Sequence, residues 1–183
     1  MRKIIVFNMV TVDGYFAGSD GNIDWHMVDS EFNDFAIKQT AEFGTLIFGK
    51  TTYDLMKSYW PTEAALKDDP TVAKLMNETP KIVFSKSLKS ATWENTVLMD
   101  EIDTNAIRKL KEEKDKDIAI FGSGEIVQQF ANLDLIDEYR LMVNPVILGE
   151  GKLLFKGVKK TNLNLVNSRT FGNGNILLYY QPK

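Results

Sequence analysis

The sequence predicts a three-layer α/β domain, with helices on both faces of a mixed, mostly parallel sheet and antiparallel strands at its C-terminal end. Two observations favour this fold class. Short, β-rich apolar runs alternate with segments of helical periodicity through the first 133 residues. After residue 135, hydrophobic and polar residues alternate, which is typical of antiparallel strands with one covered face. The 183 residues contain no linker or repeat, so we expect one domain over residues 1–183.

The parallel core is predicted from four apolar runs, which are KIIVF (3–7), TLIFG (45–49), KIVFS (81–85) and DIAIF (117–121). Their hydrophobicity is nearly continuous, which favours strands that are covered on both faces. The first run reaches Asp13 without a small-residue cleavage site, so we interpret it as a buried strand and not as a signal peptide.

Helices are predicted between and after these strands, over residues 29–43, 51–60, 69–79, 103–114 and 124–133. In the first, the apolar residues lie roughly along one side, and Asp29 or Ser30 can cap the helix N-terminus. Pro70 stands near the start of the third helix, where proline is favoured. Asp103 or Thr104 can cap the fourth. Each segment therefore has an apolar face for packing. Its start is marked by a capping residue, a proline or the end of a predicted strand.

The C-terminal end is predicted to be antiparallel. Residues 136–148 alternate, with Tyr139, Leu141 and Val143 on one face. Two more strands, 163–171 and 175–183, are joined by GNGN, which is typical of a hairpin turn. These strands would complete the same sheet.

The composition excludes several classes of function. The chain has no cysteine, which excludes disulfides, thiolate metal sites and cysteine nucleophiles, and which fits a reducing cytoplasm. The formal net charge is -3 and no long basic run occurs, so we expect no nucleic-acid partner. No apolar stretch approaches the roughly 20 residues of a membrane span, so we expect no membrane partner.

His26 is the single histidine of the chain. A zinc site would need carboxylates around it, and none stands at a recognisable spacing. Nothing nearby indicates a nucleophile elbow, which a histidine triad would need. We therefore predict no metal site and interpret His26 as an exposed or capping residue.

Two glycine turns follow predicted parallel strands: FGKTTYD (48–54) and FGSGEIV (121–127). Ligands collect at the carboxyl ends of such strands, and the backbone N–H groups at a helix start favour phosphate. In the first turn, Lys50 adds a charge, and the threonines after it add hydroxyl groups. A third segment, VFSKS (83–87), ends its strand with Ser85 and Lys86, a suitable place for a further phosphate such as the 2′-phosphate of NADPH.

Neither turn is a standard nucleotide motif. Val127 occupies the position of the third glycine in the dinucleotide fingerprint. The segment GTLIFGKT (44–51) formally satisfies the P-loop pattern, but its TLIF portion is apolar and β-prone and is interpreted as the strand itself. One such turn alone is more often structural than functional. The neighbouring turns together indicate a phosphate site.

In chain order, five segments resemble the dihydrofolate reductase-like family, in particular the reductase domain of riboflavin biosynthesis and its small stand-alone relatives. These segments are VTVDGYFAGSDGNIDW (10–25), LIFGKTTYD (46–54), KIVFSKS (81–87), IAIFGSGEIVQQF (118–130) and VNPVILGEGKLLF (143–155). Lys50 replaces the arginine that is usual in the family's G-R-x-T segment. The resemblance covers essentially the whole chain.

The resemblance implies an NADPH-dependent oxidoreductase that transfers a hydride to a small nitrogen heterocycle or its ribosyl derivative, as 5-amino-6-(5-phosphoribosylamino)uracil reductase does. It also implies a homodimer. A dihydrofolate or pterin reductase and a non-catalytic NADP-binding protein are the alternatives. The implied cofactor-binding residues are Phe16, Ala17, Gly49, Lys50, Thr51, Thr52, Ser85, Lys86, Phe121, Gly122, Ser123, Gly124, Glu125 and Ile126.

The implied substrate pocket lies between the first strand, the loop at Trp25 and the helix over 29–43. Classical dihydrofolate reductases carry an acidic residue on this helix, but the family's spacing leads here to Asn33, which cannot supply a proton near neutral pH. Asp34 would point about 100° away around the helix, whereas Asp29 lies one turn earlier. The catalytic candidates are therefore Asn33 and Asp29. The substrate-binding candidates are Asp24, Trp25, Ile37, Tyr53 and Trp60.

These candidates also have a purely structural interpretation. The aspartates would serve solvation and helix capping if none faced the cleft. Trp25 and Trp60 would be core residues if neither reached it.

Overall fold

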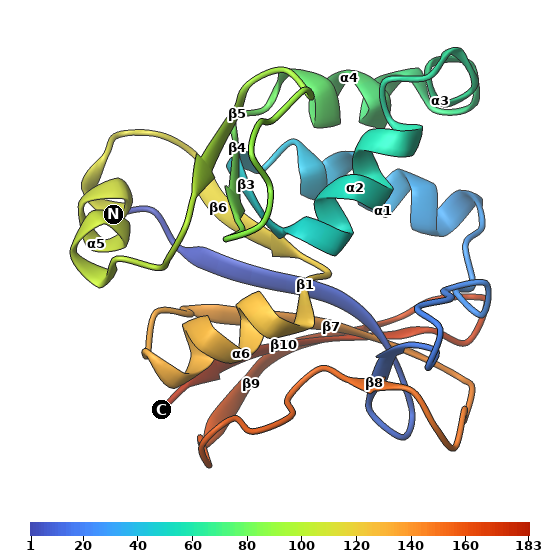
Figure 1. The fold of residues 1–183 in the computed structure, drawn as a ribbon. Helices are drawn as coiled ribbons and strands as arrows, with labels where there is room; N and C mark the ends of the chain where they lie inside the picture. Colours follow the sequence, from blue (N-terminus) through green and yellow to red (C-terminus); the bar gives the residue numbers. More distant parts are fainter.

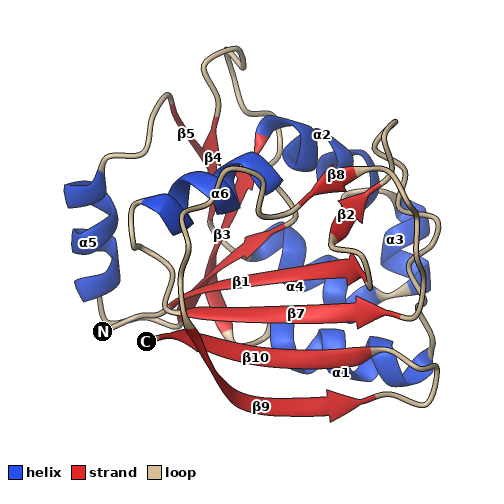
Figure 2. Cartoon of the chain, turned by 90° about the horizontal axis from the view of Figure 1, so that it is seen from below, coloured by secondary structure: helices blue, strands red, loops and turns tan.

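The predicted mixed sheet is confirmed by the computed structural model, which describes residues 1–183. Its eight strands run in the order β5-β4-β3-β6-β1-β7-β10-β9 (Figure 2). The strands are β1 (Ile4–Thr11), β3 (Phe43–Gly49), β4 (Lys81–Phe84), β5 (Thr96–Met99), β6 (Asp117–Phe121), β7 (Glu138–Asn144), β9 (Leu163–Thr170) and β10 (Ile176–Pro182). All pairs from β5 to β7 are parallel, and β10 is antiparallel to both of its neighbours.

Six helices pack around this sheet. They are α1 (Ser30–Thr40), α2 (Lys50–Tyr59), α3 (Glu63–Asp68), α4 (Pro70–Glu78), α5 (Thr104–Glu112) and α6 (Gly124–Asn132). The side chains of Asp29, Asp69 and Asp103 accept hydrogen bonds from first-turn N–H groups of α1, α4 and α5. Of the caps considered from the sequence, Asp29 and Asp103 are therefore the ones that the structure uses.

The sheet is covered on both faces, as the continuous hydrophobicity of its strands predicts. Ile4 and Val6 of β1 pack with α5 and α6, and Ile5 packs with α2 and α4 on the opposite face. Further along β1, Met9 packs against Phe35 of α1. Figure 1 shows the resulting layers, with α1, α2 and α4 on one side of the sheet and α5 and α6 on the other.

Four elements have no counterpart in the prediction: α3, β5, and the strands β2 (Tyr15–Ala17) and β8 (Lys152–Leu153). The last two form a small antiparallel sheet of their own. This sheet brings the loop after β1 next to a segment that is distant in sequence. None of the helices combines the length and the apolar character needed to cross a bilayer.

Candidate active site

A cleft of about 1180 Å³ opens at the carboxyl ends of β1, β3, β4 and β6. Open α/β sheets bind ligands at this edge. Typical small-molecule pockets measure about 300–1,000 Å³, so the cleft has room for more than one small ligand. Both glycine turns line it, together with α1, the second half of α2, and the segments that follow β1 and β4.

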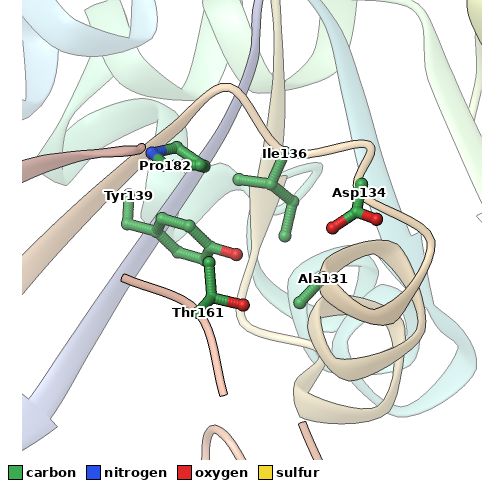
Figure 3. Close-up of a pocket in the computed structure, with 6 residues that line it drawn as sticks. All are labelled: Ala131, Asp134, Ile136, Tyr139, Thr161 and Pro182. Atoms are coloured by element: carbon green, nitrogen blue, oxygen red, sulfur yellow. The ribbon is translucent and has the colours of Figure 1, made fainter. Parts of the chain in front are cut away.

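A second pocket lies at the opposite edge of the sheet and is far smaller, at about 50 Å³. Figure 3 shows its lining, which comprises Ala131, Asp134, Ile136, Tyr139, Thr161 and Pro182. Burial, and to a lesser extent the Asp134 carboxylate, raise the pKa of Tyr139 to about 12. A space of this size holds a few water molecules, so the large cleft is the candidate active site.

The two glycine turns bind each other. The Gly49 N–H donates to Ser123 Oγ at 2.8 Å, and the Ser123 N–H donates to Thr52 Oγ1 at 2.9 Å. Gly122 has a φ of 55°, and a Cβ atom there would lie 3.0 Å from the Thr52 side chain. Glycine is therefore required for the turns to approach this closely. We call this contact between residues 49–52 and 122–124 the turn seam.

The turn seam has the chemistry of an anion site. Helices α2 and α6 both begin there, and the first N–H groups of a helix have no intrahelical partner and carry partial positive charge. The Thr52 and Ser123 hydroxyl oxygens each accept a hydrogen bond from the opposite turn, which leaves both hydroxyl hydrogens free to donate. These donors suit a phosphate group.

The lysines next to the turn seam differ in their charge balance. Lys50 forms an ion pair with Asp54, with 2.6 Å between Nζ and the carboxylate, so its charge is largely compensated. Lys86 follows β4, is exposed, and forms no ion pair. Beside it, Ser85 Oγ accepts the Leu88 N–H at 3.0 Å and fixes the turn. Lys86 is thus the uncompensated cation at the end of β4.

All fourteen residues predicted to bind the cofactor line the cleft. Phe16 and Ala17 reach it from β2, and the Phe16 ring lies directly against Gly124. A Cβ atom at Gly124 would be only 2.6 Å from Phe16 Cε1. The structure thus brings together residues from four separate segments. It also shows that residues 45–48 belong to β3, which excludes a P-loop there.

Among the catalytic and substrate candidates, only Asn33 and Trp60 line the cleft. The carboxylate of Asp29 caps α1 by accepting the Phe32 N–H at 2.8 Å. Asp24 and Trp25 lie in the loop before α1 and do not line the cleft, and the Trp25 ring packs against the cluster around Met9 and Phe35. Asp24, Trp25 and Asp29 therefore lie away from the cleft surface, and their predicted roles stay predictions.

Tyr53 and Ile37 also lie away from the cleft surface, because both side chains pack in the core between helices and sheet. Tyr53 is 1% exposed, and its hydroxyl oxygen accepts the N–H groups of Thr92 and Trp93 at 3.1 and 3.0 Å. One turn of α2 carries both a cleft-facing side and a sheet-facing side, and Tyr53 lies on the latter.

Among the polar cleft residues that were not predicted, Asn8, His26 and Gln39 each carry a buried atom without a partner. The Asn8 Oδ1, His26 Nε2 and Gln39 Oε1 atoms are buried and have no hydrogen-bond partner. His26 is not the exposed or capping residue expected, since burial lowers its pKa to about 4 and keeps the imidazole neutral. Asn8 was detectable in principle, as a polar residue that interrupts a buried strand. The structure contains no cluster of three or more histidine, aspartate or glutamate side chains that could hold a metal ion.

This fold and the cleft at its strand ends define an α/β protein of the dihydrofolate reductase-like class. The chain belongs to the RibD C-terminal domain family, whose model matches residues 2–177. The uncharacterized protein YyaP of Bacillus subtilis (strain 168) is 35% identical over 182 residues, covering 98% of this chain and 94% of YyaP. The family resemblance and the fold class inferred from the sequence are therefore confirmed.

Solved structures of other proteins share the fold, and two of them bear on the cleft. The first is a diaminohydroxyphosphoribosylaminopyrimidine deaminase/5-amino-6-(5-phosphoribosylamino)uracil reductase from Thermotoga maritima, with a TM-score of 0.71 and 17% identity. The match covers 100% of this chain and 57% of that one. The second is dihydrofolate reductase from Enterococcus faecalis complexed with NADP(H), with a TM-score of 0.67 and 15% identity over 99% of this chain and 96% of that one.

Proposed function

We propose that the protein is a cytoplasmic, NADPH-dependent reductase that transfers a hydride to a small nitrogen heterocycle. The turn seam is the observation that carries this proposal, because two helix N-termini and two free hydroxyl hydrogens converge on one edge of the cleft. The names of the two similar structures, a uracil reductase and a reductase complexed with NADP(H), support it.

The residues at the cleft fit such a cofactor. The turn seam would receive the pyrophosphate at the N-termini of α2 and α6, where the glycines at 122 and 124 make room for the side chains of Thr52 and Phe16. Ser85 and Lys86 would receive the 2′-phosphate, while Phe16 and Ala17 would cover the nicotinamide end and exclude water. When bound, NADPH supplies the hydride, and the chain supplies position and electrostatics.

Asn33 is proposed to orient the substrate at the α1 side of the cleft. Its side chain is exposed at the cleft surface, and its amide can donate and accept hydrogen bonds. It cannot deliver a proton near neutral pH. No carboxylate of α1 faces the cleft, so α1 supplies no proton to the substrate.

NADPH is expected to raise the melting temperature more than NADH does. At a concentration of about 100 times Kd, NADPH would add about 2.7 kcal/mol to the free energy of unfolding, or about 5–10 °C. Lys86→Ala should bring the NADPH shift close to the NADH shift, whereas Lys89→Ala, at an exposed position outside the cleft, should not. Thermal unfolding without a shift from either nucleotide would rule out the proposed function.

A non-catalytic NADP-binding protein is the second candidate, favoured by Asn33 at the position where classical enzymes carry an acid. NADPH oxidation separates the two functions when it is followed across dihydrofolate, pterins and pyrimidines. Oxidation with any of these compounds supports the reductase and identifies its substrate class. Stabilisation by NADPH without oxidation of any member supports the binding protein.

We also propose that the protein forms a homodimer through β9. This edge strand is exposed along nearly its whole length and carries Leu165 at 56% exposure and Val166 at 51%. Light scattering should give twice the chain mass of 20.8 kDa, and lysine at both positions should give the monomer. A wild-type mass of one chain would reject the dimer.

A further inference from the structure

The half of the cleft away from the turn seam is lined mainly by apolar and aromatic side chains. They come from α1, from the second half of α2 and from α4, and they include Phe32, Leu55, Met56, Tyr59, Trp60 and Val72. On α1, the cleft-lining residues recur at the 3.6-residue period, from Phe32 through Ala36 to Gln39. Flat surfaces of this kind suit a planar ring.

No lysine or arginine of α1, of the second half of α2 or of α4 lines the cleft. Three lysines line the whole cleft: Lys50 and Lys86 beside the turn seam, and Lys152 in β8. The charged residues on the apolar side are Asp68 and Asp69, where α3 meets α4. A phosphate placed there would lose its hydration and would meet only carboxylates.

Neutral side-chain amides also lie in the wall of the cleft. Gln39 of α1 is 3% exposed and Asn8 of β1 is 4% exposed, yet Gln39 Oε1 and Asn8 Oδ1 have no partner in the protein. A buried polar atom without a hydrogen bond costs about 1–3 kcal/mol, so a ligand that supplies the missing partner would be favoured. An amide presents both a donor and an acceptor, as the ring edge of a nitrogen heterocycle does.

We propose that the substrate is a planar, uncharged nitrogen heterocycle without a phosphate group, bound between the apolar side chains of α1 and α2 and hydrogen-bonded to Gln39. The proposal rests on the proposed reductase function, since it concerns the substrate half of the same cleft. It separates this chain from the phosphoribosylamino substrate in the name of the Thermotoga maritima enzyme.

Riboflavin and flavin mononucleotide provide the test, because they differ by one phosphate group, and lumazine serves as a smaller uncharged ring. Affinities are measured by equilibrium dialysis at low and high salt, with and without NADPH. Riboflavin should bind at least tenfold more tightly than flavin mononucleotide at low salt. The difference should shrink as salt screens the carboxylates. Equal or tighter binding of flavin mononucleotide, or no binding of either uncharged ring, would overturn the proposal.

Gln39→Leu tests the hydrogen bond. It should weaken riboflavin and lumazine binding about tenfold, the worth of one lost hydrogen bond, and leave the NADPH-induced shift in melting temperature unchanged. Lys38→Leu, at the neighbouring exposed position outside the cleft, should change neither. If the Gln39→Leu variant bound riboflavin and lumazine as tightly as the wild type, the proposed hydrogen bond to Gln39 would be wrong. If NADPH stabilises the protein and the phosphorylated ring is preferred, only this inference fails; if NADPH does not stabilise it, the proposed function itself fails.

Discussion

Replacing Gly122 with alanine is expected to lower the affinity for NADPH at least about tenfold. The residue has a φ of 55°, where a Cβ atom costs roughly 1–2 kcal/mol. The new methyl group would also lie 3.0 Å from Thr52 Cγ2 and Oγ1, and moving Thr52 would break its hydrogen bond with the Ser123 N–H. The turn seam would open, and its donors would no longer converge. Calorimetric titration with NADPH measures the loss.

Gly157→Ala is the matched control for this change. Gly157 has a similar φ of 72°, but a Cβ atom there meets nothing within 4 Å, and the residue does not line the cleft. Both variants should lose stability through backbone strain, and only Gly122→Ala should lose NADPH affinity. Wild-type affinity in Gly122→Ala would show that the nucleotide does not bind at the turn seam.

Tyr53→Phe is expected to lower the free energy of unfolding by about 1–3 kcal/mol while leaving ligand affinities unchanged. The hydroxyl group accepts two backbone N–H groups, from Thr92 and Trp93, and the phenylalanine ring would leave them without a partner. Urea denaturation measures the free energy of unfolding, and titrations with riboflavin and NADPH measure the two ligand affinities.

Tyr59→Phe is the control on the same helix. Tyr59 lines the cleft, is 42% exposed, and its hydroxyl group makes no hydrogen bond within the protein. Its loss should change the free energy of unfolding by less than about 0.5 kcal/mol. If Tyr53→Phe kept full stability but lost riboflavin binding, Tyr53 would be a substrate residue after all.

The strands and helices of the sheet could be predicted because local signals and burial agree there. Continuous apolar runs mark strands that are covered on both faces, and β1, β3, β4 and β6 are such strands. The cofactor segments could be placed for the same reason. They directly follow these strands, and parallel strands end at one edge. Their meeting follows from the topology alone.

The substrate half could not be predicted equally well, because it depends on which way single side chains point. Asp29, Ile37 and Tyr53 belong to the correct elements, but the capping position and the helix period direct them away from the cleft. His26 lies in an irregular loop, where no helical or strand periodicity predicts the direction of its side chain. The β2–β8 pair joins segments too short and too distant to show a strand pattern.

The place of β1 in the sheet has a consequence for how the cleft can form. The partners of β1 in the large sheet are β6 and β7, so Ile4 pairs with Ile118 and Ile5 with Glu138. During synthesis, the first strand emerges long before either partner and has no neighbour in that sheet until most of the chain exists. Such long-range parallel pairing is slow, and the apolar strand β1 is prone to aggregation until its partners have been synthesised. Binding activity should therefore be acquired last in folding, when the central strand is enclosed.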